Sequence, residues 1–83
     1  MKERKHRKAP IYPTLAAYRT TMNINQYEMA EEIKMSASNY GKKENDIVKF
    51  RVDEMILITN IIKKEFPNAT MDMIFQRSDN ESN

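Results

Sequence analysis

The chain of 83 residues contains few side chains that could act together in catalysis. The hydroxyls of Ser36, Ser38 and Tyr40 have no histidine near them, because His6 is the single histidine. A nucleophile needs a base within hydrogen-bonding reach, so these hydroxyls lack an activating partner. Three carboxylates that could act as acids or bases fall on solvated faces of a predicted helix: Glu28, Glu31 and Glu32. We therefore expect a protein that is not an enzyme.

The composition excludes several further kinds of site. The chain has no cysteine, which rules out disulfides and cysteine-ligated zinc, and its one histidine argues against other metal sites. Its single glycine excludes a glycine-rich loop that cradles phosphates. No apolar stretch approaches the ~20 residues of a membrane span, and no signal-peptide core follows the basic start. We expect no metal, no cofactor, no membrane association and a cytoplasmic location.

The segment from residue 25 to residue 46 carries the most informative pattern. Asn25 and Glu28 stand three residues apart, the spacing of a capping box that opens a helix. Ser36 can cap a second helix by accepting a hydrogen bond from a backbone N–H in its first turn. Ala30 is small where that second helix would have to cross closely. A helix, a short turn and a second helix at a steep angle place one helix in the DNA major groove, so DNA binding is our leading hypothesis.

Positive charge is concentrated at the start of the chain. The whole chain has a net charge of +2, from 14 Lys and Arg against 12 Asp and Glu. Residues 1–10 are expected to form a flexible basic arm that enters a minor groove or lies along phosphates, or else serves as a solubilising tail. The cations of this arm are Lys2, Arg4, Lys5, Arg7 and Lys8. The rest of the chain is slightly acidic.

Hydrophobic periodicity predicts an all-α fold. The ranges expected to be helical are 14–22, 26–33, 37–44, 52–65 and 71–75. We place the folded domain at residues 11–76, between the arm and a disordered polar tail at residues 77–83. The linker between the third and fourth predicted helices carries Ile47, Val48 and Phe50, which we expect to pack on the core.

The predicted helix at residues 52–65 has two groups of apolar residues. One group shares a side at 100° per residue and is expected to face the core: Val52, Met55, Ile56, Ile62 and Phe66. The second group, Leu57 and Ile61, points away from that side. Two interpretations stay open for the second group: the arm or the last helix covers it, or it forms the contact between two copies in a homodimer.

These features together resemble the phage repressor/Cro-type (XRE-like) helix-turn-helix DNA-binding family over about residues 14–75. The residues that carry the resemblance are Arg19, Gln26, Glu28, Ala30, Tyr40, the pair Glu44-Asn45 and the closing segment 70–75. The resemblance implies a compact five-helix, lambda-repressor-like domain with the helix-turn-helix at its second and third helices.

The resemblance also implies roles for single residues. Arg19 is expected to form an ion pair with Glu44, which ties the first helix to the end of the third without reading DNA. Base edges would be contacted from the third helix, by Ala37, Ser38, Asn39 and Lys42. Phosphates would be contacted by residues of both helices and of the linker: Gln26, Ser36, Lys43, Asn45, Lys49 and Arg51.

Four positions depart from the family's pattern. Lys34 stands where the family usually has a glycine in the turn, and a left-handed backbone there is strained for lysine. Asp46 replaces another common glycine and puts a negative charge beside the phosphate contacts. Lys43 replaces a commonly aliphatic residue, and Gly41 inside the third helix costs ~1 kcal/mol relative to alanine. These departures weaken the expectation of strong sequence specificity more than that of the fold.

The sequence is compatible with two functions. The first is a sequence-specific transcriptional regulator of phages or mobile elements that binds double-stranded DNA as a homodimer. The second is a protein-interaction module on the same fold, such as an antirepressor or the partner of another regulatory protein, with weak or no DNA binding. The slightly acidic body, the small reading surface, Leu57 and Ile61 favour the second.

Overall fold

The computed structural model describes residues 10–78, and this part of the chain is all-helical. Its helices are α1 (Pro13–Thr21), α2 (Gln26–Glu32), α3 (Ala37–Glu44), α4 (Val52–Lys63) and α5 (Met71–Ile74), and no strand occurs between residues 10 and 78. The predicted all-α class is therefore confirmed. The predicted basic arm, with Lys2, Arg4, Lys5, Arg7 and Lys8, lies outside the described residues, as do residues 79–83 of the predicted tail.

Local hydrogen bonds at the helix ends explain where the helices begin. The side chain of Asn25 accepts from the backbone N–H of Glu28 at 2.8 Å, and that of Glu28 accepts from the N–H of Asn25 at 2.9 Å. The capping box before α2 is therefore complete. Ser36 caps α3 and Thr70 caps α5, each by accepting from the N–H three residues further on.

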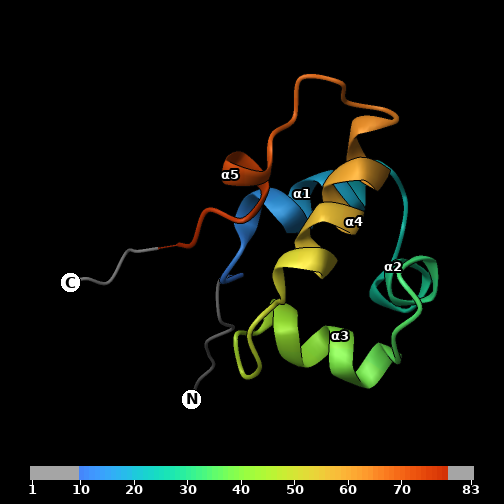
Figure 1. Cartoon of the computed structure of the whole chain (residues 1–83), viewed down its shortest axis with the longest axis vertical. Coiled ribbons are helices and arrows are strands. Elements are labelled where there is room, and N and C mark those ends of the chain that lie inside the picture. Colours follow the sequence, from blue (N-terminus) through green and yellow to red (C-terminus); the bar gives the residue numbers. More distant parts are fainter. Residues whose placement is uncertain (1–9, 79–83) are drawn as a thin grey trace, which may run out of the picture.

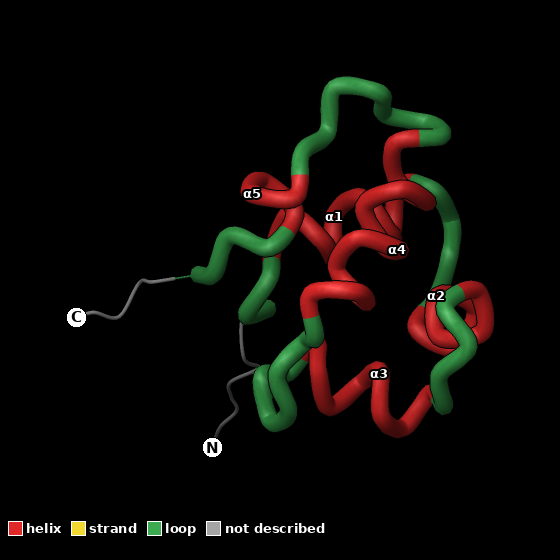
Figure 2. Tube along the Cα trace, viewed as in Figure 1, coloured by secondary structure: helices red, strands yellow, loops and turns green. Residues whose placement is uncertain are grey.

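The helix α3 forms an outer edge of the molecule (Figure 1). In that view α1 and α4 lie at the centre, α5 lies beside them, and α2 lies near the start of α3. The helix α2 is seen nearly along its axis while α3 runs across the picture, so the two cross at a steep angle. The tube in Figure 2 shows no other described segment beyond α3 on the side that faces away from α4. One side of α3 is therefore left open.

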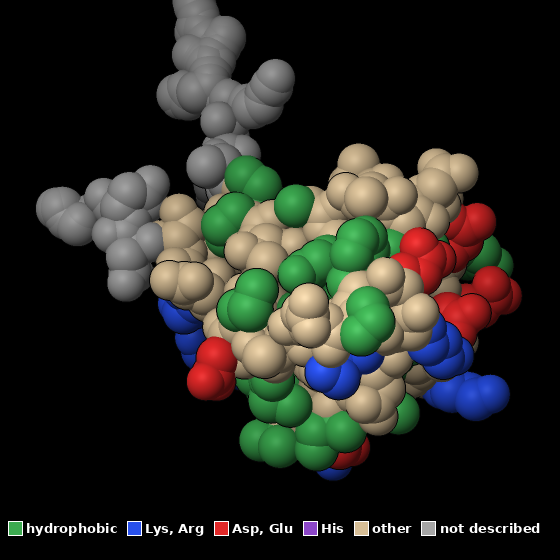
Figure 3. All heavy atoms as spheres, turned by 90° about the horizontal axis from the view of Figure 1, so that it is seen from above, with side chains coloured by type: hydrophobic (Ala, Val, Ile, Leu, Met, Phe, Trp, Pro, Cys, Tyr) green, Lys and Arg blue, Asp and Glu red, His purple; other side chains and the backbone are tan. Residues whose placement is uncertain are grey.

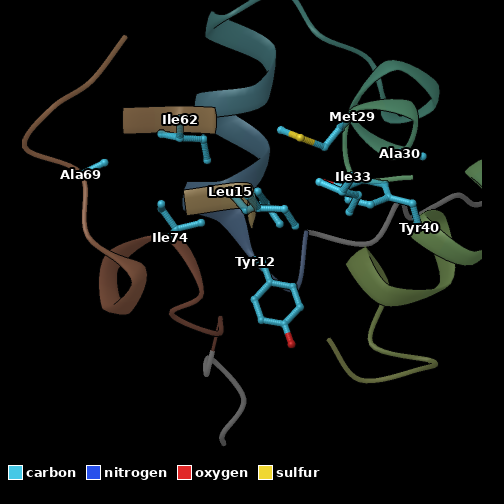
Figure 4. Packing of buried hydrophobic residues seen from close by; sticks show 10 residues of the cluster. Tyr12, Leu15, Met29, Ala30, Ile33, Tyr40, Ile62, Ala69 and Ile74 are labelled. Carbon is cyan, nitrogen blue, oxygen red and sulfur yellow. The ribbon is translucent and has the colours of Figure 1, made fainter. Parts of the chain in front are cut away.

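All five helices contribute apolar side chains to one core (Figure 4). The largest fully buried side chains are those of Tyr40, Leu15, Met29, Ile58, Ile62 and Ile74. Phe50 of the linker packs edge-on against three rings, with centroid distances of 5.6 Å to Tyr12, 5.9 Å to Tyr40 and 5.2 Å to Phe75. Phe50 therefore anchors the linker to the core, as expected for this residue.

The buried side of α4 differs from the predicted one. Ile58, Thr59 and Ile62 are its buried residues, whereas Val52 is 67% exposed and Ile56 is also exposed. At 100° per residue, Ile56 and Ile58 lie on nearly opposite sides of the helix, so burying Ile58 turns Ile56 outward. The prediction that Val52 and Ile56 face the core is therefore wrong.

Exposed apolar side chains remain on α4, at Val52, Ile56 and Leu57, and we call these three residues the α4 patch. Ile61 packs against the core instead, so it drops out of the predicted contact between two copies. The linker residues Ile47 and Val48 are exposed, in contrast to the prediction. The N–H of Ile47 is bound to the last turn of α3, which keeps this part of the linker at the surface.

The folded part extends past the predicted boundary at residue 76. The N–H of Ser78 donates to the carbonyl of Ile11 at 2.8 Å. Arg77 lies 2.7 Å from a carboxylate oxygen of Asp46, and its guanidinium lies 5.9 Å from the centre of the Tyr12 ring. The predicted disordered tail is therefore wrong for Arg77 and Ser78.

Three non-glycine residues between residues 10 and 78 have a left-handed backbone: Asn23 and Lys34 with φ of 62°, and Asp46 with φ of 63°. Asn and Asp tolerate this conformation better than other residues, because their short side chains can hydrogen-bond locally. Lys34 lacks that compensation. The strain expected in the turn between α2 and α3 is therefore greatest at Lys34.

Replacing Lys34 with glycine should raise the free energy of unfolding by about 0.5–1 kcal/mol, since glycine adopts a positive φ without a Cβ clash. Lys42→Gly is the matched control, because Lys42 lies inside α3, where glycine costs about 1 kcal/mol. Urea unfolding followed by circular dichroism measures both changes. Effects of the same sign would contradict the assignment of strain to Lys34.

Candidate nucleic-acid interface

The carboxylate of Glu44 fixes the end of α3, and its side chain is 8% exposed. Oε2 of Glu44 accepts from Arg19 Nε at 2.9 Å and from Tyr40 Oη at 2.6 Å. Oε1 accepts from Gln26 Nε2 at 3.0 Å and from Arg19 Nη2 at 3.4 Å. Arg19 belongs to α1 and Gln26 to α2, so one carboxylate joins the first three helices. The ion pair expected between Arg19 and Glu44 is present.

Burial makes this Glu44 network costly to disturb. The side chain of Arg19 is 14% exposed, and it also donates to the carbonyl of Ile24 at 3.0 Å. Burial raises the pKa of Tyr40 far above its ordinary value, and the charge of Glu44 raises it further. Tyr40 therefore keeps its proton and continues to donate to Glu44 at neutral and moderately alkaline pH.

A second ion pair ties α3 to α4. Lys43 Nζ lies 2.6 Å and 2.7 Å from the two carboxylate oxygens of Glu54, and the ammonium is largely buried. Glu54 also accepts from the backbone N–H of Arg51 at 2.9 Å, before the start of α4. Lys43 follows the buried Tyr40 by three residues, so the helical period turns it inward. The predicted phosphate contact of Lys43 is therefore wrong, because its charge is used inside the protein.

The other side of α3 presents small polar groups to solvent. Ser38, Asn39 and Lys42 are exposed, and Ala37 is half-buried beside them. Ser36 is also exposed, although its Oγ already accepts from the N–H of Asn39 at 3.1 Å. Within residues 10–78, Lys42 forms no ion pair, unlike Lys43. Ser38 and Lys42 stand four residues apart and therefore share this open side, and we call these two residues together with Ala37 and Asn39 the α3 face.

Gln26 and Asn45 meet at the C-terminal end of α3. Both line a pocket of about 260 Å³, and the other residues around it are Pro10, Ile11, Ala16, Arg19 and Glu44. Asn45 is exposed, whereas Gln26 already donates one amide hydrogen to Glu44 and keeps one for another acceptor. Because Pro10 lines this pocket, the sequence that carries the basic arm joins the domain next to both residues.

The cations of the linker are paired with acids. Lys49 Nζ lies 3.1 Å from Asp46, and Arg51 Nε lies 3.3 Å from Asp53. Both side chains are largely exposed, so these pairs contribute little stability and their cations stay accessible. Arg77 was not anticipated as part of this surface. The sequence around Arg77 is polar and contains no pattern that indicates a contact with the distant Asp46.

Asp46 has a shifted protonation equilibrium. The hydrogen bond from Arg77 lowers the pKa of Asp46 to about 2, with a smaller contribution of the same sign from Lys49. Asp46 in turn raises the pKa of Arg77 above its ordinary value. Asp46 is therefore ionised throughout the neutral and mildly acidic range.

Acidic side chains gather on the side of the molecule where α2 lies (Figure 3). The exposed acids of α2 are Glu28, Glu31 and Glu32. A polyanion that approached this side would be repelled. The exposed acids of α2 therefore make its outer side unfavourable for contact with a nucleic acid.

Comparison with known proteins gives no family, since neither a protein-family model, nor a curated protein, nor a solved structure matches the chain. No helix between residues 10 and 78 is long and apolar enough to cross a membrane. Over the same residues, no group of three or more histidine or acidic side chains is placed to hold a metal ion.

Replacing Glu44 with alanine should lower the free energy of unfolding by about 3 kcal/mol, because Arg19 and Tyr40 lose the acceptor that compensates their burial. The matched control is Glu31→Ala, on an exposed position of α2, which should change it by less than about 0.5 kcal/mol. Urea unfolding at neutral pH measures both. Equal effects would mean that the Glu44 network does not hold the first three helices together.

The carboxyl group of Asp46 should titrate with a pKa of about 2, and Arg77→Gln should move this pKa back toward 3.8. Because folding lowers the pKa, the interaction stabilises the domain at neutral pH and is lost as the pH falls from about 4 to about 2. Carboxyl-carbon NMR titration of both proteins measures the two pKa values. An unchanged pKa in Arg77→Gln would assign the shift to Lys49 instead.

Proposed function

We propose that the chain is a sequence-specific DNA-binding transcriptional regulator of the repressor/Cro type, and not an enzyme. In this proposal α2 and α3 form the helix-turn-helix of a lambda-repressor-like domain, and α3 enters the major groove of double-stranded DNA. The observation that carries the proposal is the open α3 face, held at a steep angle to α2 by the buried Glu44 network. Reading bases requires such a rigid support, because each contact depends on geometry.

Base edges are read from the α3 face. Lys42 donates to the O6 and N7 acceptors of guanine, while Ser38 and Asn39 exchange hydrogen bonds with neighbouring bases. Ala37 offers its methyl group to a thymine methyl. Because Lys43 is held by Glu54, one cation serves this face, and specificity rests on few contacts.

Phosphate contacts surround the α3 face. They come from residues at both of its ends and in the linker: Ser36, Gln26, Asn45, Lys49 and Arg51. The basic arm joins the domain at Pro10, beside Gln26 and Asn45. Its five cations supply the net positive charge that residues 10–78 lack, because these residues contain as many acids as cations.

Two copies of the chain bind one operator as a homodimer in this proposal. The α4 patch is the surface through which the copies meet, because it is apolar and exposed. In a twofold contact the patch of one copy meets the same patch of the other.

The α4 patch also favours a second candidate function, that of a protein-interaction module that binds another regulatory protein. Leu57→Asp separates the two. In a DNA-binding regulator it should weaken the dimer and leave binding to a single half-site. In an interaction module it should abolish binding of the protein partner, whereas changes at Ser38 or Lys42 should not.

Selection of bound duplexes from a random DNA pool at two salt concentrations tests the proposal. An inverted repeat with half-sites about 34 Å apart would support a homodimeric reader. The logarithm of the binding constant should fall against that of the salt concentration with a slope of about −0.9 per neutralised phosphate. A folded protein that enriches no sequence and binds no duplex would contradict the proposal and favour the second candidate.

Lys42→Ala should weaken binding to the selected duplex by about 1–3 kcal/mol, roughly 5- to 150-fold, and should change binding to unrelated duplexes much less. Lys64→Ala is the matched control, because Lys64 is exposed at the opposite end of α4 from α3. Fluorescence anisotropy with both duplexes at one salt concentration measures the ratio. If Lys42→Ala weakened all duplexes equally, Lys42 would contact phosphate and not a base.

A further inference from the structure

Three charged residues from two separate parts of the chain meet beyond the C-terminal end of α3, and we call Asp46, Lys49 and Arg77 the Asp46 cluster. Asp46 directly follows Asn45, the residue that ends α3. Its carboxylate lies 3.1 Å from Lys49 Nζ and 2.7 Å from Arg77 Nη2. One acid faces two cations, so the cluster keeps a net positive charge.

Two contacts hold Arg77 in this cluster, one made by the backbone of the next residue and one made by its own side chain. The N–H of Ser78 donates to the carbonyl of Ile11 at 2.8 Å, which holds the backbone. The guanidinium of Arg77 lies 5.9 Å from the centre of the Tyr12 ring, within the range of a cation–π contact. Groups that are already held in place lose less conformational freedom when they bind a ligand.

Both cations keep donors for a further anion. Lys49 is 75% exposed and Arg77 is 45% exposed, whereas Asp46 between them is 16% exposed. An ammonium has three N–H donors and a guanidinium has five, more than the carboxylate of Asp46 engages. An anion that approaches from solvent therefore meets the two cations before it meets the acid.

The cluster lies next to the C-terminal end of the α3 face. Asp46 lies just past the end of α3 with a left-handed backbone, and the turn that it forms folds back on the helix, where the carbonyl of Lys42 accepts from the N–H of Ile47 at 2.8 Å. A reading helix in the major groove has the sugar-phosphate backbone beside its ends. The cluster therefore stands where a duplex seated on the α3 face would present phosphates.

We propose that Lys49 and Arg77 together bind a phosphodiester group of the DNA backbone, with Asp46 as the residue that positions them. This inference rests on the proposed function and adds Arg77, from the segment after α5, to the interface. The planar guanidinium suits the role, because it can donate two parallel hydrogen bonds to phosphate oxygens. Asp46 competes with phosphate for both cations, so it also limits the affinity.

The salt dependence of duplex binding tests this site. Arg77→Gln should make the slope of log K against log salt shallower by about 0.9 for each bound copy, the value for one phosphate contact, and should weaken binding several-fold at low salt. Lys64→Gln is the matched control, since it removes the same charge at the opposite end of α4 and should leave the slope unchanged.

Arg77→Lys separates charge from folding of the segment after α5. It keeps the positive charge without the guanidinium fork, so it should retain the wild-type slope. Its affinity is expected to fall because the two parallel hydrogen bonds are lost, but a salt slope in Arg77→Lys as shallow as in Arg77→Gln would show that the positive charge is not what contacts phosphate, and would overturn the site.

Three further results would also overturn the site. Equal slopes for Arg77→Gln and Lys64→Gln would do so and leave the proposed function intact. Absence of binding to any duplex by the folded wild-type protein would overturn both. Competition by poly-glutamate as strong as by a duplex of equal charge would assign the Asp46 cluster to an acidic protein partner instead.

Discussion

The position of α3 depends on one buried carboxylate. Glu44 is surrounded by donors from Arg19, Gln26 and Tyr40, so α1, α2 and α3 share a single charged centre. A buried charge is costly without such partners, and the same cost makes alternative arrangements of the three helices unfavourable. The ion pair of Lys43 with Glu54 adds α4 to this support. The inner side of α3 is thereby committed to structure, and its outer side is left to bind a ligand.

The contrast between the buried and the exposed side of α3 determines how the proposed regulator would bind DNA. Two of the three charged side chains of α3 are used inside the domain, and Lys42 alone is left outside. Residues 10–78 carry no net charge, with nine Lys and Arg against nine Asp and Glu, and exposed acids lie along α2. Attraction to a duplex must therefore come from cations around α3, in the linker, in the basic arm and at Arg77. The α3 face would contribute specificity, and the surrounding cations affinity.

Local signals predicted much of the fold. The predicted caps at Asn25 and Ser36 depend on residues three apart, and the structure contains both. Non-local packing was predicted less well: the exposure of Val52 depends on how far α4 extends past the core, which no local pattern encodes. The helical period indicated that Lys43 faces inward, because it follows the buried Tyr40 by three residues. Its charge indicated an exposed position instead, since the sequence does not show that Glu54 pairs with it. No local pattern indicated the position of Arg77, because its contact with Asp46 joins segments far apart in the chain.

Chemical-shift mapping directly tests whether the open side of α3 is the surface that contacts a duplex. Backbone amide shifts of the isotope-labelled protein are followed as a duplex is added at low salt. If α3 meets the duplex, the largest changes are expected at Ser38, Asn39 and Lys42, with Glu31 and Glu32 of α2 unchanged. Changes confined to the α4 patch, or an α3 face that does not respond to any duplex, would contradict this role of α3.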